Sequence, residues 1–181
     1  MSQIKVNSIV PVGGLPAGAS GGGIIQCVQT VISDVKSYTA NANTFTDMPG
    51  FNCTITPSSN SNKVLIVVSI GAIHQDAGTI AGKVLRGSTD IGIGDAAGVR
   101  PRCGFRMFGS NVYNSNHCGS YQYNFLDSPA TTSATTYKLQ TAGESGSSYP
   151  VYLNQVLSDT NATEIYRGRT ISTMTLYEVS V

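Results

Sequence analysis

Apolar and polar side chains alternate along most of the chain after residue 23, with the two-residue period of a half-buried β-strand. Residues 24–33 set Ile25, Cys27 and Val31 against polar neighbours, so we expect these three side chains on the buried face of a strand. Residues 64–73 form a near-continuous apolar run rich in β-branched side chains. Such a run predicts a strand that is buried on both faces.

Further short strands follow at regular intervals, separated by Gly, Asn, Asp and Ser. They are predicted at residues 51–56, 79–86, 89–93, 103–108, 120–127, 134–141, 150–156 and 171–180. The Ser/Asn-rich turn after Pro57 predicts that strand 51–56 pairs with the next strand as an antiparallel hairpin. No segment shows capped helical spacing. The pattern predicts an all-β fold, a single jelly-roll-like antiparallel β-sandwich over residues 24–181.

The predicted strand at residues 120–127 has two chemically distinct faces. Tyr121, Tyr123 and Phe125 alternate with Gln122 and Asn124. One interpretation packs this strand against a neighbouring subunit, since the chain has few charges to protect exposed sheet edges. The other interpretation places the aromatic face in the core of the same chain. The sequence leaves both open.

Residues 1–23 differ in character from the rest of the chain. Their second half is dominated by glycine and proline, and it buries too little apolar surface to fold alone. Their first half is apolar. We therefore predict an extended N-terminal docking arm with a Gly-rich neck, followed by the β-sandwich head. The residues predicted to dock on a larger particle are Ile4, Val6, Ile9 and Val10.

Composition narrows the possible partners. Only 12% of residues are charged, against roughly 25% in typical soluble proteins, and the net charge is +1. Nothing therefore steers the chain toward nucleic acid or an anionic membrane, and little charge repulsion opposes self-association. No apolar run reaches the length of a membrane span, and no secretory signal is expected. Four cysteines without a C-x-x-C spacing favour free structural thiols over disulfides, with Cys27 and Cys53 expected in buried positions.

Catalytic and metal-binding patterns are sparse. His117 and Cys118, taken with Cys103, lack a further ligand at zinc spacing, so no metal is predicted. The sequence contains no nucleophile elbow, zincin or Walker motif. We therefore predict a non-enzymatic protein without a cofactor. A carboxylate pair for glycoside cleavage, such as Asp90 and Asp95, remains an alternative.

The segment 100–123 combines arginines with aromatic side chains. Guanidinium groups and flat rings suit sugars, phosphates or carboxylates on a cell surface, and loops on a rigid scaffold often carry binding sites. The competing interpretation is that the aromatics fill the sandwich and the arginines are solvated at its rim. The candidate residues for host-surface binding are Arg100, Arg102, Arg106, Phe108 and Tyr113.

Several blocks resemble small structural proteins of tailed bacteriophages, especially marine and cyanobacterial phages. These blocks are IKVNSIVPVGGLPAGASGGGIIQCVQT, FNCTITPSSNSNKVLIVVSIGAI, FLDSPATTSATTYKLQT and STMTLYEVSV. The resemblance implies a virion tail-fibre protein that forms homotrimers, attaches to other virion proteins by its N-terminal segment and binds host surface polysaccharide with its β-sandwich. The chain lacks the shaft of a typical fibre. A short fibre or fibre tip is therefore expected, with a capsid decoration protein and a small glycan depolymerase as alternatives.

Overall fold

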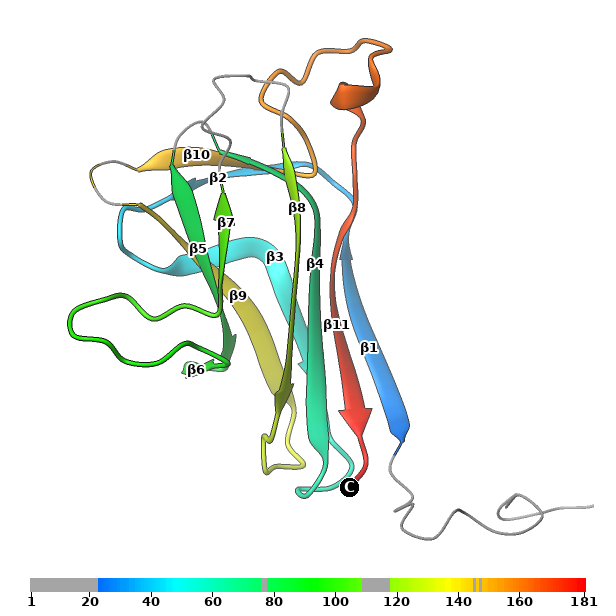
Figure 1. Ribbon diagram of the computed structural model, residues 1–181. Helices are drawn as coiled ribbons and strands as arrows, with labels where there is room; N and C mark the ends of the chain where they lie inside the picture. The colour runs from blue at the N-terminus through cyan, green and yellow to red at the C-terminus, as the bar shows by residue number, and fades with distance from the viewer. Residues whose placement is uncertain (1–22, 76–77, 109–117, 145, 147) are drawn as a thin grey trace, which may run out of the picture.

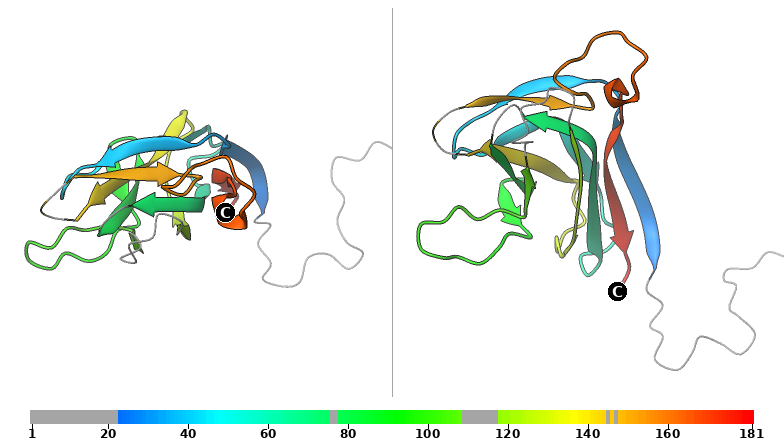
Figure 2. Two further views of the ribbon diagram at one scale, coloured as in Figure 1. Left: turned by 90° about the horizontal axis from the view of Figure 1, so that it is seen from above. Right: turned by 45° about the horizontal axis from the view of Figure 1, so that its top comes forward.

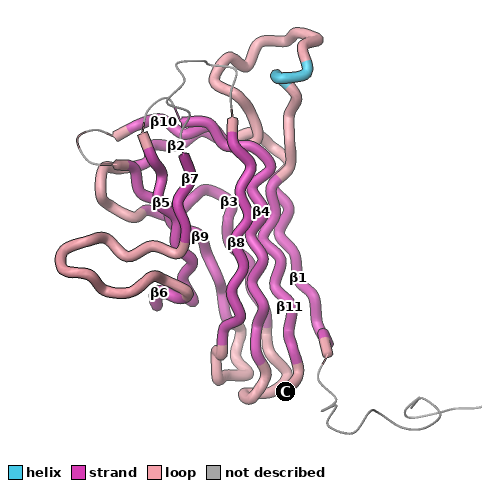
Figure 3. Tube along the Cα trace, in the orientation of Figure 1, coloured by secondary structure: helices cyan, strands magenta, loops and turns pink. Residues whose placement is uncertain are grey.

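The computed structural model describes residues 23–75, 78–108, 118–144, 146 and 148–181. Two antiparallel sheets, sheet A and sheet B, face each other over these residues (Figure 1). Figure 3 shows strands and connecting loops throughout, with one short helical turn, η1 (Ile165–Arg167). The predicted all-β sandwich is confirmed.

Sheet A has six strands and sheet B has five. The strands of sheet A are β1 (Ile24–Ile32), β2 (Lys36–Ala40), β4 (Lys63–Gln75), β8 (Gly119–Asp127), β10 (Tyr149–Leu153) and β11 (Ser172–Val179). Those of sheet B are β3 (Thr46–Ile55), β5 (Thr79–Arg86), β6 (Thr89–Ile91), β7 (Phe105–Phe108) and β9 (Thr135–Gly143). The sequence pattern missed β2, a five-residue strand whose polar composition gives no clear alternation.

The strand order is that of a jelly roll. Without the short β2, β6 and β10, sheet A runs β1-β11-β4-β8 and sheet B runs β3-β9-β5-β7. The first and last of these eight strands are therefore neighbours, and the chain passes between the sheets in the Greek-key manner, except at β5 and β7, which pair within sheet B. The far end of β4 pairs with β10, which pairs with β2, and these two strands run across the end of the sandwich (Figure 2).

The predicted hairpin between β3 and β4 is wrong. β3 pairs with β9 in sheet B, whereas β4 pairs with β11 and β8 in sheet A. The two strands instead lie in opposite sheets, and Phe51 and Ile55 on one and Val64 and Ile66 on the other, each at most 1% exposed, belong to the same apolar core. Apolar burial between the sheets thus replaces backbone pairing, and the turn between the strands crosses from one sheet to the other.

A buried carboxylate holds this crossing turn. Glu178 of β11 is 1% exposed. Its Oε1 accepts hydrogen bonds from Ser58 N at 2.7 Å, Ser58 Oγ at 2.7 Å and Asn62 Nδ2 at 2.6 Å. Burial raises the pKa of Glu178, but these hydrogen bonds outweigh it and leave the pKa below its ordinary value. The ionised carboxylate therefore stabilises the connection between the sheets.

A second polar cluster joins the sheets near the end of β8. Asp127 accepts hydrogen bonds from Arg86 Nη1 at 2.8 and 3.0 Å and from the Tyr137 hydroxyl at 2.8 Å. Burial, together with the hydrogen bond to Asp127, raises the pKa of Tyr137. Since Arg86 and Tyr137 belong to sheet B and Asp127 to sheet A, this cluster fixes the separation of the two sheets at that edge.

The aromatic face of β8 lies in the core of its own chain. Tyr121, Tyr123 and Phe125 pack against the buried apolar cluster. The Tyr123 ring stacks on Phe105 with centroids 5.0 Å apart, and its hydroxyl donates to Gly92 O at 2.7 Å. The interpretation that these aromatics fill the sandwich is confirmed for the described residues.

Two burial predictions for sheet A are wrong. In β1, Ile25 and Val31 are 55% and 52% exposed and Cys27 is exposed, so the expected inner face points outward. In β4, alternate residues from Val64 to Ile70 are buried, whereas Leu65 lies on the opposite face and is only partly covered. The two-residue period identifies faces but not which face meets the core.

All four cysteines are free thiols, as predicted. Cys53 is buried, Cys103 is partly exposed, and Cys27 and Cys118 are exposed. Among the described residues, no helix is long and apolar enough to cross a membrane.

The predicted docking residues Ile4, Val6, Ile9 and Val10 lie outside the described residues. The described chain begins beside its own C-terminal end, because Ser180 N donates to Gly23 O at 2.9 Å. The first described residue therefore lies at the end of the sandwich where β11 finishes (Figure 1).

Glu178→Gln is expected to destabilise the fold by about 1–3 kcal/mol at pH 7, since it removes a charged acceptor from a buried cluster. The stabilisation exists above the unfolded pKa and is lost as the pH falls through the lowered folded pKa. Urea unfolding at pH 7 and pH 3 should therefore show a smaller pH dependence in the variant. The control is D47N, because Asp47 is a carboxylate that pairs with Lys138 at the surface, where solvent screens the ion pair. An equal loss in both variants would contradict the assignment.

Candidate functional site

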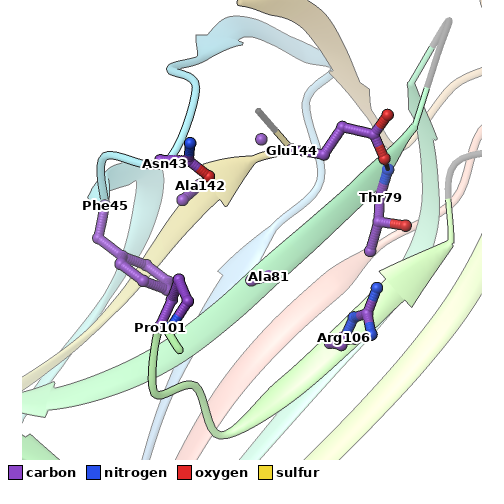
Figure 4. A pocket seen from close by; sticks show the side chains of 9 residues that line it. Asn43, Phe45, Thr79, Ala81, Pro101, Arg106, Ala142 and Glu144 are labelled. Carbon is purple, nitrogen blue, oxygen red and sulfur yellow. Dashed lines mark hydrogen bonds between the residues drawn. The ribbon is translucent and has the colours of Figure 1, made fainter. Parts of the chain in front are cut away.

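A shallow cleft of about 110 Å³ opens on the outer face of sheet B (Figure 4). Ala81 of β5 and Ala142 of β9 form its floor, and they are direct partners in the antiparallel register. Two adjacent small side chains leave a hollow between the taller residues on either side. The cleft is lined by Asn43, Phe45, Thr79, Ala81, Pro101, Arg106, Ala142, Gly143 and Glu144.

One wall of the cleft is aromatic. Phe45 precedes β3, in a turn fixed by the hydrogen bond from Asn43 N to Gly143 O at 3.0 Å. Lys83 Nζ lies 4.6 Å from the centroid of the Phe45 ring and also pairs with Asp90 at 2.9 Å. The cation–π contact and the ion pair together hold the ring at the edge of the cleft. Figure 4 shows the ring beside Pro101.

The loop that carries Pro101 is held by its own polar groups. Arg102 Nε donates to Gly94 O at 2.6 Å, and Gly94 N donates to Cys103 O at 3.0 Å. Gly92 begins this loop with φ at +56°, a conformation that favours glycine. Its carbonyl accepts the hydrogen bond from Tyr123, so the loop is attached to the core aromatics.

The opposite side of the cleft carries two opposite charges. Glu144 Oε2 accepts a hydrogen bond from Thr79 N at 3.1 Å, drawn as a dashed line in Figure 4. Arg106 lies opposite Ala81 in the register of β7 and β5, and its side chain is exposed. Within the described residues, no carboxylate lies within 4.0 Å of the Arg106 guanidinium. Its hydrogen-bond donors are therefore available to a ligand.

The structure separates the residues that the sequence grouped together. Arg106 lines the cleft, whereas Arg102 supports the neighbouring loop and Arg100 is in that loop but outside the lining. Phe108 ends β7 opposite Thr79 in the register. Tyr113 lies outside the described residues.

Sequence reasoning missed Asn43, Phe45 and Glu144. They are distant in sequence from Arg106 and belong to two segments, the turn before β3 and the end of β9. Their only common signal is position: each lies at an end of a strand of sheet B, and strand pairing brings these ends together. That pairing is not visible in a linear sequence.

A second hollow lies in the loop before β11 and includes Arg167 and Arg169. Both arginines are already paired: Arg169 with Asp159 at 2.7 Å, and Arg167 with Glu164 at 3.4 Å and with Ser158 Oγ at 2.9 Å. The unpaired guanidinium across the cleft from an aromatic ring therefore favours the cleft on sheet B as the candidate binding site.

Metal-ligating side chains do not cluster in the part of the chain that is described: no three His, Cys, Asp or Glu residues come together there. Of the three residues considered above as zinc ligands, His117 lies outside the described residues. Asp90 of the possible carboxylate pair is held by Lys83. Glu144 is the carboxylate that lines the cleft.

Comparisons with known proteins give a distant likeness. The sequence matches no protein-family model and no curated protein. Among solved structures, the chain is similar to VP2 in the subviral particle of infectious bursal disease virus, at 9% identity and a TM-score of 0.35. The match covers 86% of this chain and 41% of that chain, so this chain spans less than half of that protein's length. No residue role follows from a likeness at this level.

Arg102→Ala is expected to loosen the loop that forms the Pro101 wall. Losing a charged donor to a backbone carbonyl should speed amide hydrogen exchange over residues 92–104 by about tenfold. Arg100→Ala is the matched control, since it removes an arginine from the same loop without breaking the bond to Gly94. Equal exchange in the two variants would show that Arg102 does not hold the loop.

Proposed function

We propose that this chain is a non-enzymatic virion structural protein, a short tail fibre or fibre tip of a tailed bacteriophage. Its head would bind host-surface glycan through the cleft on sheet B, and its arm would attach it to the particle. The observation that carries this proposal is the position of the cleft. An unpaired guanidinium and an aromatic ring lie far from the end at which the N-terminal arm joins the head.

Strand directions support this polarity. Val179 of β11 and Lys63 of β4 are partners at the end where the described chain begins and finishes. β9 starts near the same end, because Tyr137 bonds to Asp127 there. β9 then runs for nine residues before Glu144. At about 3.3 Å per residue, roughly 25–30 Å separate the two ends. A particle attached at one end would leave the cleft accessible at the other.

The chemistry of the cleft suits a sugar. A pyranose ring has an apolar C–H surface that can lie against the Phe45 ring and Pro101. Its hydroxyl groups can pair with the Asn43 amide, while Arg106 can donate to a hydroxyl, a carboxylate or a phosphate substituent. A few polar groups around an apolar surface are the usual composition of a ligand site.

The cleft is small and open, so a single copy should bind weakly. A homotrimer would present three clefts on one particle-bound head, and several weak contacts would multiply through effective concentration. Trimerisation also agrees with the low charge of the chain, because little repulsion keeps copies apart.

The proposed partner of residues 1–23 is another virion protein. Ile4, Val6, Ile9 and Val10 lie close enough in sequence to add a strand to a sheet edge or to fill an apolar groove. The Gly-rich neck that follows would uncouple the head from the orientation of the docking site.

Arg106→Ala is expected to weaken binding of the full-length protein to immobilised bacterial surface polysaccharides. Losing charge-assisted hydrogen bonds should reduce the apparent affinity by about 10- to 100-fold. Arg100→Ala should bind like the unmodified protein, since Arg100 does not line the cleft. Binding to no polysaccharide in the panel, or equal losses in both variants, would contradict the site. Shortening of a bound polysaccharide would favour a depolymerase instead.

Deletion of residues 1–12 is expected to abolish incorporation into particles while leaving the head folded. Incorporation should fail because the deletion removes the proposed docking residues. The head should stay folded because its first strand begins at Ile24, after the deleted segment. Purified particles carrying each version are compared by mass spectrometry, and circular dichroism checks the fold of the free protein. Normal loading of the truncated chain would defeat the docking role. Copies spread over the capsid shell rather than the tail would make this a decoration protein.

A further inference from the structure

The outer face of β1, β11, β4 and β8 carries no charge over three complete rows of side chains. Each row consists of direct register partners across the four strands, and we call the three rows together the uncharged plate. The rows are Cys27, Tyr177, Leu65, Leu126; then Gln29, Thr175, Val67, Asn124; then Val31, Thr173, Ser69, Gln122.

Half of the plate is apolar and open to solvent in the isolated chain. Val31 is 52% exposed, Leu126 is 46% exposed, and Cys27 is exposed. Leu65 and Val67 are partly exposed between them. A continuous neutral surface that carries a tyrosine, amides and hydroxyls has the composition of the core of a protein interface, from which charges are depleted.

The opposite face of the sandwich has a different chemistry. On the outer side of sheet B, Lys138 pairs with Asp47 at 2.9 Å and Lys83 pairs with Asp90 at 2.9 Å. Arg106 is exposed on the same side. None of the ion pairs among the described residues lies on the plate. One face of the head thus suits water, whereas the other lacks the charges that keep a surface solvated.

The sequence pattern predicts more buried side chains on β1 and β4 than the single chain buries. Ile25, Cys27 and Val31 form the apolar face of β1, and β4 has an apolar run suited to burial on both faces. In the isolated chain, these β1 side chains and the outer side chains of β4 remain wholly or partly exposed. A surface that covers the plate would satisfy the pattern on both strands at once.

We infer that the uncharged plate is buried against other copies of this chain, around a threefold axis that runs along the strands. This inference rests on the proposed homotrimeric head and identifies the surface that forms it. An uncharged surface brings no like charges together when identical copies meet. An axis parallel to β1 and β11 also leaves every N-terminal arm at the same end, where all arms can reach one particle.

The size of the plate fits this role. Four strands about 4.8 Å apart and three rows about 6.7 Å apart give a footprint of roughly 400 Å². A standard interface buries about 800 Å² on each partner. The plate would therefore form the centre of the contact, with Ile25, Val179 and the charged Lys63, the register partner of Val179, at its margin beside the first row.

Asn124→Lys tests the plate, and Asn52→Lys is its matched control. Both asparagines are exposed at mid-strand, but Asn124 lies on the plate and Asn52 lies on the outer face of sheet B. Light scattering of the full-length protein at micromolar concentration should give three times the 18.9 kDa chain mass. N124K should reduce this to the mass of one chain, whereas N52K should leave it unchanged.

The Cys27 thiol gives a second readout that does not require the variant. Alkylation followed by peptide mapping should show Cys27 protected at least tenfold in the oligomer relative to a diluted, dissociated sample. Cys103 lies in the loop beside sheet B and serves as the internal reference.

Three outcomes would overturn the inference: an unmodified protein that is monomeric at micromolar concentration, an oligomer that N124K leaves intact, or a Cys27 thiol that reacts equally in both samples. Polysaccharide binding by the same samples separates this from the proposed function. If monomeric N124K binds polysaccharide weakly and R106A weakens that binding further, the cleft is intact. The N124K substitution has then changed assembly alone.

Discussion

The structure depends on the packing of two sheets through their inner apolar faces. Side chains such as Phe51 and Ile55 of sheet B and Ile66 and Leu176 of sheet A are at most 1% exposed, and no backbone pairing joins β3 to β4 or β11. At about 25 cal/mol for each Å² of buried apolar surface, this contact dominates the favourable terms of folding. It also carries the chain from one sheet to the other at β3–β4, β4–β5 and β8–β9.

The cleft and the uncharged plate are consequences of that packing. Once the inner side chains are committed to the core, the alternate positions of each strand must face outward. On sheet B these positions carry ion pairs and two adjacent alanines, which produce a solvated face with a hollow. On sheet A they carry neutral and apolar groups. The same alternation therefore generates a charged outer face with a cleft and an uncharged outer face.

Polar clusters set the geometry of the connections between the sheets. Glu178 and Asp127 are buried carboxylates with several hydrogen-bond donors each. A buried carboxylate without partners would be expensive, so each cluster is held as a unit. Glu178 positions the turn that carries the chain from β3 to β4, and Asp127 joins the edge of sheet A to β5 and β9. Both clusters lie far from the cleft and support it only through the strands.

Strand existence and fold class followed from the sequence, because alternation and turn residues are local properties. The order of strands did not, since pairing of β1 with β11 or β3 with β9 joins segments distant along the chain. For the same reason the sequence found Arg106 but not Phe45 or Glu144. The sequence identified the apolar face of β1 but not whether that face points toward the core, because only packing against the second sheet decides which face is inside.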